Sequence, residues 1–409
     1  MKRLLLVTVL VGLLLFAALS TGFSLYYRLL YILALAFGGG LVWAWLNLHW
    51  LGLEVEHRVT RTQVGGTIEG RIWVRNRGRL PKAWLEVEEL ANLPGHYSGQ
   101  VVSLGGGGFR SWRVRTVCRQ RGIYDLGPLR VSSGDPFGLI HLERLLPTHQ
   151  RVVVYPAIVG LPHFTLPPSD LPSDGLVRQQ MQQLTPLAST VRDYLYGDSV
   201  NRIHWPSTAR LGRLMTKEFD LGFSTDVWMA LDLHREVQAG EPPDSTEEVA
   251  VTIAASIAKR LLDQGMAVGL VAHGDQHSMI PPARGYVQME RLLEYLAQVR
   301  AEGEAPLEQA LASMEYRLNR YNALLVITPS SRAQLAHVLA KFRSRGVRPT
   351  AILLDNSSFG GTLMPAQLME QLSNLAVPAY LVQQGVPLQE ALSRPFAWAG
   401  NGVAPEIRR

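Results

Sequence analysis

RDYLYGDSVNRIHWPSTARLGRLMTKEFD, residues 192–220, mixes charged, aromatic and small residues densely within one short segment. Buried strands are apolar, and the polar face of a solvated helix seldom carries so many aromatic residues, so neither pattern fits this segment. Charges placed so closely must either satisfy one another in a network or face a partner. The charged and histidine positions are Arg192, Asp193, Asp198, Arg202, His204, Arg210, Arg213, Lys217, Glu218 and Asp220.

This segment resembles the signature of the domain of unknown function 58 family, whose members carry R-x-Y-x-x-G-D-x-x-R-x-I-x-W followed by A-R. One position departs from the pattern, because its second arginine falls on Asn201, with Arg202 immediately after it. Three other stretches also match family features: RGIYDLGPL (121–129), DPFGL (135–139) and VYP (154–156). The matching signature positions are Arg192, Tyr194, Gly197, Asp198, Ile203, Trp205, Ala209 and Arg210.

The resemblance implies a non-enzymatic, membrane-tethered protein-interaction or assembly factor with a von Willebrand factor A-like domain. Relatives are often encoded beside MoxR-type AAA+ ATPases, so such an ATPase is the expected partner. We interpret the signature as an interaction surface or interdomain network, in which Trp205 anchors between domains and Asp198 accepts from Arg202 or from free N–H groups of a following helix. The predicted members of this network are Arg192, Asp193, Tyr194, Gly197, Asp198, Arg202, His204, Trp205 and Arg210.

A hydrolase is the alternative reading of the same segment. His204 lies near Asp193 and Asp198 in sequence, with serine and threonine hydroxyls close by, which is the composition of a catalytic triad. No G-x-S-x-G nucleophile motif is present. In many relatives the position of His204 is acidic, which disfavours a histidine-based mechanism. We therefore predict no catalytic residues.

The N-terminus contains two long uncharged runs, residues 4–27 and 29–53, separated by Arg28. About 20 apolar residues span a bilayer, so two transmembrane helices are predicted at about 4–26 and 29–51. Glycines 38–40 would permit close packing in the second helix, and its tryptophans would form an interfacial belt. A cleaved signal peptide is the competing interpretation. Arginines are frequent after residue 54, so the positive-inside rule places the remaining chain in the cytoplasm, at the inner membrane.

Residues 54–160 show period-two alternation, for example along 67–74, interrupted by turns rich in glycine or proline. This pattern predicts a small antiparallel β-sandwich or barrel. A proline-rich linker is expected over 161–185, followed by the signature over 186–225. Residues 226–393 alternate apolar strands with helices, which predicts an α/β domain with a mostly parallel sheet covered on both faces. Residues 394–409 are expected to form a tail.

The first strand of this α/β domain ends in Asp232-Leu233-His234-Arg235-Glu236. A-type domains that bind a metal carry D-x-S-x-S here, and both serines are replaced in this chain. Alternation along a strand would place Asp232, His234 and Glu236 on one side, so they are weak candidates for a metal set. A divalent-cation-dependent adhesion module centred on Asp232 is therefore a third hypothesis, although no metal is predicted.

Overall composition restricts the remaining function classes. The net charge is +6, but no basic cluster is interleaved with stacking aromatic residues, so nucleic-acid binding is not expected. The excess of basic residues fits a surface near anionic lipid instead. The one cysteine, Cys118, is predicted to be a small core residue on a strand. No P-loop or dinucleotide-binding motif occurs, so no cofactor is expected, and the oligomeric state is left open.

Overall fold

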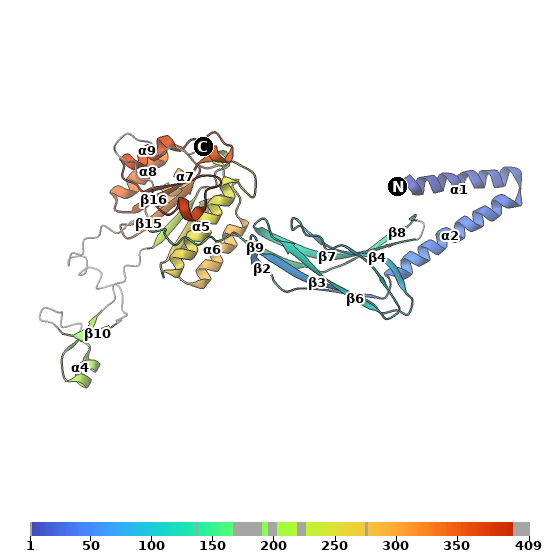
Figure 1. Cartoon of the computed structure of the whole chain (residues 1–409), viewed down its shortest axis with the longest axis horizontal. Helices are drawn as coiled ribbons and strands as arrows, with labels where there is room; N and C mark the ends of the chain where they lie inside the picture. Colours follow the sequence, from blue (N-terminus) through green and yellow to red (C-terminus); the bar gives the residue numbers. More distant parts are fainter. Residues whose placement is uncertain are drawn as a thin grey trace. The chain divides into compact units, whose positions relative to one another are not determined.

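The computed structural model describes residues 2–135, 138–166, 190–194, 203–218, 226–274 and 277–395 (Figure 1). Most of the predicted linker and nearly all of the predicted tail lie outside these ranges. The chain forms two compact units. The first comprises Met1–Ile158, Glu241–Pro243 and Glu290–Val299, and the second comprises Val159–Gly240, Asp244–Met289 and Arg300–Arg409.

Two apolar helices begin the first unit, α1 (Lys2–Thr21) and α2 (Ser24–Leu48). The predicted bounds were wrong, because α1 ends earlier than expected and Arg28 lies within α2 instead of in the turn. The turn forms at Gly22, which has φ +67° and donates its N–H to the carbonyl of Ala18, so this glycine ends α1 in the left-handed conformation. Of the described residues, α2 is the helix that is long and apolar enough to cross a membrane, and the apolar segment Val7–Thr21 is shorter.

The C-terminal end of α2 is fixed to the β domain by polar contacts. Asn47 is buried and donates from Nδ2 to the carbonyl of Ala83 (3.2 Å) and to Ser133 Oγ (3.1 Å). Lys82 is 1% exposed, and its Nζ donates to the carbonyl of Leu46, one of the last carbonyls of the helix. Burial lowers the pKa of Lys82. The C-terminal end of α2 is therefore bonded directly to residues of the β domain.

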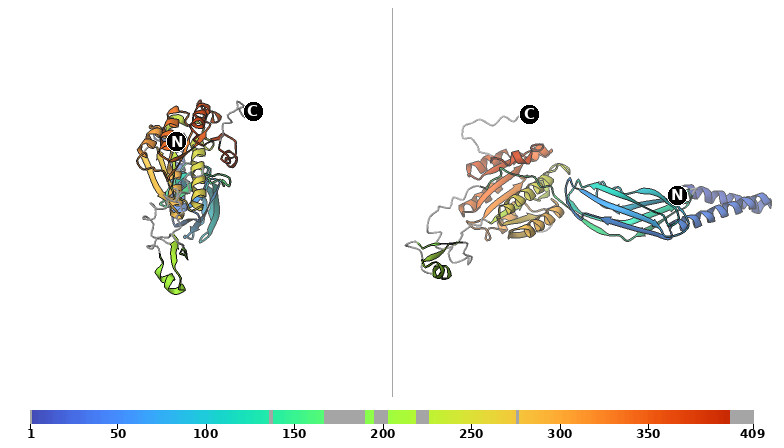
Figure 2. Two further views of the ribbon diagram at one scale, coloured as in Figure 1. Left: turned by 90° about the vertical axis from the view of Figure 1, so that its left-hand side faces the viewer. Right: turned by 60° about the horizontal axis from the view of Figure 1, so that its bottom comes forward.

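The β domain consists of two sheets (Figure 2), and their inward side chains form a common core. One sheet is antiparallel with order β1-β3-β6, and the other has order β2-β9-β7-β4-β5 with β8 paired to β7. The pair β2–β9 is parallel. Strand β3 alternates buried and exposed residues, which confirms the predicted period-two pattern, and the first strand begins at Leu51, earlier than predicted. The strands are β1 (Leu51–His57), β2 (Arg61–Gln63), β3 (Thr67–Asn76), β4 (Lys82–Ala91), β5 (Gln100–Leu104), β6 (Phe109–Val117), β7 (Gly122–Gly134), β8 (His141–Leu146) and β9 (Gln150–Tyr155).

The C-terminal α/β region contains a six-stranded sheet of order β14-β13-β12-β15-β16-β17. Neighbouring strands are parallel except for the edge strand β14, which is antiparallel to β13. The sequence did not predict β14, because its two prolines interrupt a strand pattern and are tolerated only at an edge. The strands are β12 (Val227–Leu231), β13 (Val268–His273), β14 (His277–Ala283), β15 (Ala323–Thr328), β16 (Arg348–Leu354) and β17 (Ala379–Val382).

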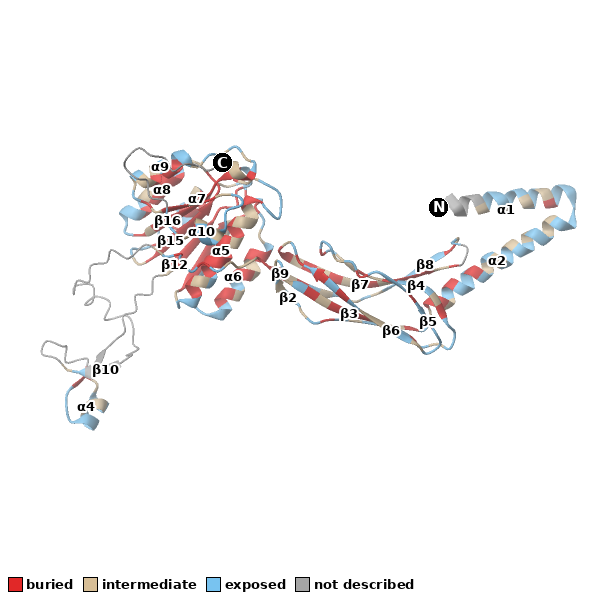
Figure 3. Cartoon of the chain, in the orientation of Figure 1, coloured by how far each residue is buried: buried red, intermediate tan, exposed pale blue. Residues whose placement is uncertain are grey.

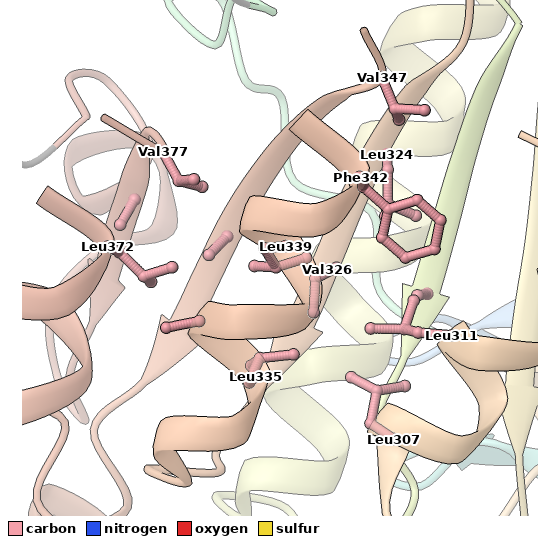
Figure 4. Packing of buried hydrophobic residues seen from close by; sticks show 14 of the residues in the cluster. Leu307, Leu311, Leu324, Val326, Leu335, Leu339, Phe342, Val347, Leu372 and Val377 are labelled. Atoms are coloured by element: carbon pink, nitrogen blue, oxygen red, sulfur yellow. The ribbon is translucent and has the colours of Figure 1, made fainter. Parts of the chain in front are cut away.

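Helices cover this sheet, and β12, β15 and β16 are buried along nearly their whole length (Figure 3). Figure 4 shows one core, in which Leu311 of α7, Leu339 of α8 and Leu372 of α9 pack with Leu324 and Val326 of β15. Helix α5 contributes nothing to that cluster and packs against β12, β13 and β15, so it covers the other face. The helices are α5 (Thr246–Asp263), α6 (Tyr286–Gln298), α7 (Leu307–Ser313), α8 (Ala333–Ser344), α9 (Ala366–Asn374) and α10 (Leu388–Ala391).

Candidate functional site

The signature forms a small lobe, which we define as the described residues 190–194 and 203–218. Strand β10 (Thr190–Asp193) pairs antiparallel with β11 (Met215–Glu218), and helix α4 (Trp205–Leu211) precedes β11. The backbone N–H of His204 donates to the carbonyl of Met215, which ties the start of α4 to the strand pair. A minimal core is formed by side chains that are less than a tenth exposed: Ile203, Met215 and Thr216.

The structure gives His204 a local role as the N-cap of α4. Its Nδ1 accepts hydrogen bonds from the backbone N–H of Ser207 (3.3 Å) and from Ser207 Oγ (2.7 Å). A side chain that accepts from the N–H two or three residues into a helix stabilises the helix start. The helix ends at Gly212, which adopts φ +68°. The serine and histidine contact is therefore explained by helix capping.

Charged members of the predicted network lie in different surroundings. Asp193 is exposed and pairs with Arg213 at 3.1 Å (Arg213 Nη1 to Asp193 Oδ2). Arg192 lies on β10, Tyr194 follows that strand, and Arg210 is exposed in the last turn of α4. The remaining predicted members lie outside the described residues: Gly197, Asp198 and Arg202.

The lobe exposes large apolar side chains. Trp205 is 63% exposed, and Leu211 and Leu214 are 54% and 46% exposed. The indole of Trp205 is therefore not buried against the other described residues. Arginines 210 and 213 are exposed beside these apolar groups. The lobe therefore offers aromatic, aliphatic and guanidinium groups to solvent together.

A second polar site lies at the carboxyl ends of β12 and β15. Asp232 is 2% exposed, and its Oδ2 accepts from Thr328 Oγ1 at 2.5 Å, while Oδ1 accepts from the backbone N–H of His234 at 3.1 Å. Thr328 Oγ1 in turn accepts from the N–H of Ser330 at 2.9 Å. Burial raises the pKa of Asp232, although the bonds from Thr328 and His234 oppose the shift; the nearby charge of Glu308 adds to it.

The weak metal candidates do not form a ligand set. Strand β12 ends at Leu231, and Glu236 lies in a 3₁₀ turn, so the expected alternation that would align Asp232, His234 and Glu236 is wrong. His234 Nε2 lies 3.7 Å from Glu236 Oε2, and the same carboxylate oxygen pairs with Arg332 at 3.3 Å. Within the described residues, no group of three or more His, Cys, Asp or Glu side chains is arranged to hold a metal ion.

A third polar cluster, which the sequence did not predict, lies inside the β domain. Glu89 Oε2 lies 3.0 Å from His57 Nε2 and 3.3 Å from His96 Nε2, and all three side chains are at most 2% exposed. The other imidazole nitrogens meet Gln150 Oε1 and Thr116 Oγ1, each at 2.9 Å. Because these residues come from both sheets, the cluster joins the sheets through polar bonds as well as apolar packing.

The charges in this cluster reinforce one another. Burial alone would lower the pKa of His57, but its hydrogen bond to Glu89 and the charge of that carboxylate raise it overall. Burial alone would raise the pKa of Glu89, but its hydrogen bonds to the two imidazoles and their charges lower it overall. A signal was present in the sequence, because Glu89 falls on the same face of β4 as the buried residues Leu85 and Val87.

Comparison with known proteins supports the predicted family. The model of the family described as "Protein of unknown function DUF58" matches residues 190–353, which contain both the lobe and the Asp232 site. The chain is 27% identical over 191 residues to the "Uncharacterized protein YeaD" of Bacillus subtilis (strain 168), a match that covers 46% of each protein. The chain therefore matches about half the length of that relative, and the family resemblance is confirmed over this part.

Solved structures show weaker similarities. One is the CARDB domain of the PF1109 protein from Pyrococcus furiosus in complex with di-metal ions, at 18% identity and a TM-score of 0.20, covering 25% of this chain and 91% of that one. Another is proximal thread matrix protein 1 from the mussel byssus, at 15% identity and a TM-score of 0.30, covering 42% and 45%. TM-scores this low do not establish that these proteins share the fold of this chain.

Proposed function

We propose that this protein is a membrane-anchored, non-enzymatic interaction or assembly factor whose signature lobe binds a MoxR-type AAA+ ATPase. The observation that carries the proposal is the exposure of Trp205, at 63%, at the start of a helix that is capped at both ends. The family resemblance is the reason for naming the ATPase as the partner.

The chemistry of the lobe supports a binding role. Exposing a tryptophan and two leucines to water is unfavourable by about 25 cal/mol per Å² of apolar surface, so such groups commonly mark an interface. Tryptophan and arginine are also enriched among the residues that contribute most to protein–protein binding. Trp205 with Arg210 is therefore suited to a partner surface that combines an apolar pocket with acidic groups, while Arg213 pairs with Asp193 within the lobe.

The proposed anchor is a hairpin of α1 and α2 in the inner membrane. The length and apolar composition of α2 support a span, and α1 is 20 residues long. The basic residues at positions 2 and 3, and those that follow α2, favour a cytoplasmic location for both termini. The proposal places the β domain, the lobe and the α/β region on that side.

The α/β region is proposed to be a von Willebrand factor A-like domain. The sheet order, the antiparallel edge strand β14 and helices on both faces support this assignment. In open α/β sheets, ligands bind beyond the carboxyl ends of strands where the order reverses, which is the position of Asp232 and Thr328. In this chain those two side chains bond to each other, so we assign them to domain stability rather than to ligand binding.

The proposal is tested by crosslinking pulldown from native membranes, with the ATPase held in its ATP-bound state. Trp205→Ala removes the exposed indole, and Trp84→Ala is a matched control because Trp84 is 61% exposed in the β domain. A residue central to an interface contributes at least about 2 kcal/mol, so Trp205→Ala is expected to lower the affinity about 30-fold. The control is expected to recover the ATPase as the wild type does.

Two results would contradict the proposal. If the wild-type chain recovers no AAA+ ATPase under these conditions, the partner is wrong. If Trp205→Ala and Trp84→Ala recover it equally, the lobe is not the binding surface. Circular dichroism and hydrogen exchange across β10 and β11 show in each case whether the lobe is still folded.

A further inference from the structure

The turn between β7 and β8 packs against the side of α2. Gly40 of α2 makes this approach possible: a Cβ atom on it would lie 3.1 Å from Asp135 Cβ and 3.3 Å from Ile140 Cδ1. A Cβ atom on Gly38 or Gly39 would meet nothing within 4 Å. Of these three glycines, Gly40 therefore allows the β7–β8 turn to approach α2, whereas the sequence predicted that all three would permit close packing in the helix.

This contact lies well inside the apolar helix. Gly40 precedes the last residue of α2, Leu48, by eight positions, which is about 12 Å along the axis. Trp43 and Trp45 lie between them and are 42% and 49% exposed. Tryptophan side chains prefer the boundary between lipid headgroups and acyl chains. The turn therefore reaches past these tryptophans, to the apolar side of that boundary.

The described N–H groups of the turn, those of Asp135, Gly138, Leu139 and Ile140, are paired within the turn itself. Asp135 Oδ1 accepts from the N–H groups of Leu139 (2.7 Å) and Ile140 (2.6 Å). The carbonyl of Asp135 accepts from Gly138 N–H, and its own N–H donates to the carbonyl of Ile140, each at 3.1 Å. Irregular backbone is excluded from lipid unless its polar groups are paired, and the four described N–H groups meet that requirement.

The side chain of Leu139 also faces apolar surroundings. It lines an open apolar groove of about 740 Å³ together with Val7 of α1 and Leu30, Leu33 and Phe37 of α2. Such a groove is unfavourable in water and favourable when acyl chains fill it. The carboxyl group of Asp135 is buried in the turn, and exposed charged residues follow on β8 at Glu143 and Arg144, at the height expected for headgroups.

From these contacts we infer that the described segment 138–140 between β7 and β8 is a membrane-entering anchor, which places Leu139 against lipid acyl chains beside α2. The inference rests on the proposed insertion of α2. It adds a second attachment of the β domain to the bilayer, apart from the covalent one at the end of α2. The occupant of the groove is the acyl region of the bilayer itself.

The test uses the full chain in phosphatidylcholine vesicles, with single cysteines carrying a fluorophore and with lipids brominated along their acyl chains as quenchers. Cys118 is fully buried, so the wild-type chain is the labelling blank. Leu139→Cys reports the turn, and Leu35→Cys, at a position 79% exposed on α2, reports the span. Leu145→Cys reports a position on β8 that lies six residues, about 20 Å, beyond Leu139. Tyr97→Cys, at a position 88% exposed, reports a site in water.

Quenching at Leu139→Cys comparable to that at Leu35→Cys, with none at Leu145→Cys and Tyr97→Cys, is the expected result. Quenching at Leu35→Cys but not at Leu139→Cys overturns the inference and leaves the membrane span intact. Equal quenching at positions 139 and 145 also overturns it, because the hairpin would then lie flat on the surface. If Leu35→Cys is not quenched, the proposed span fails, and the inference fails with it.

Discussion

Glu89 in the β domain and Asp232 in the α/β region are both buried carboxylates, yet their pKa values shift in opposite directions. The pKa of Glu89 is lowered and that of Asp232 is raised. Burial acts on both groups in the same sense, since it disfavours the charged form. The difference comes from the partners: two imidazoles that can carry positive charge face Glu89, whereas a hydroxyl and one backbone N–H face Asp232.

This difference assigns the two sites different physical roles. An ion pair such as His57–Glu89 resists the loss of either member, because the remaining charge would be left buried without compensation. A buried carboxyl whose hydrogen bonds come from a hydroxyl and a backbone N–H leaves no opposite charge behind when a neutral group of similar shape replaces it. The contrast can be tested by substitution and by pH, through three measurements of decreasing expected effect.

Glu89→Gln should have the largest effect, because it removes the charge that both imidazoles face. Breaking a buried pair by removing one partner costs about 3 to 5 kcal/mol of unfolding free energy. Hydrogen exchange of the β4 amides in the full chain measures the loss in the β domain alone. Glu143→Gln on the exposed side of β8 is the matched control, with an expected change within about 0.5 kcal/mol. An equally small change at Glu89 would show that the cluster is not an ion pair.

Asp232→Ala should have an intermediate effect, because it leaves the Thr328 hydroxyl and the His234 N–H without an acceptor. The expected cost is about 1 to 3 kcal/mol, measured by exchange of the β12 amides. Asp232→Asn keeps a neutral acceptor in place and should cost less than about 1 kcal/mol. A larger cost for the asparagine variant than for the alanine variant would show that the acceptor role of this side chain does not account for its contribution to stability.

The smallest effect is a pH dependence with opposite signs in the two regions. The contribution of Glu89 is present above its ordinary pKa of 4.5 and is lost as pH falls through the lowered value. That of His57 is complete below its ordinary pKa of 6.5 and is lost as pH rises through the raised value. Together they stabilise the β domain most between pH 4.5 and 6.5.

The contribution of Asp232 is complete below its ordinary pKa of 3.8 and declines as pH rises through the raised value. Acidification below pH 4.5 should therefore weaken β4 and strengthen β12, by no more than about 1.4 kcal/mol per pH unit for each group. Amide exchange at a series of pH values, corrected for the intrinsic rate, measures both strands in one sample. If the stabilities of β4 and β12 changed with pH in the same direction, the partners assigned to Glu89 and Asp232 would be wrong.

Much of the fold could be predicted from local patterns. The apolar runs predict α1 and α2, the alternation over residues 67–74 predicts β3, and the succession of apolar strands and helices over residues 226–393 predicts the α/β region. These elements depend on periodicity, which is a local property. The edge strand β14 and the turn at Gly22 were missed because tertiary pairing and backbone conformation decide them.

The candidate sites were harder to predict. Trp205 was found from a motif, and His204 was recognised as a polar neighbour, but only the geometry shows that it caps a helix. The cluster of His57, Glu89 and His96 has no sequence spacing of its own, since folding brings three separate segments together. Cys118 is buried as predicted, directly after β6 instead of within it, and burial raises the pKa of its thiol.

The junction between α2 and β1 has a mechanical consequence. Only His49 and Trp50 separate the helix from the strand, and the carbonyl of Trp50 accepts from Arg77 N–H at 2.7 Å. Lys82 and Asn47 form hydrogen bonds between the end of α2 and the β domain at the same place, so the connection between them is rigid. If α2 spans a bilayer as proposed, a tilt or rotation of the helix would therefore turn the β domain with it.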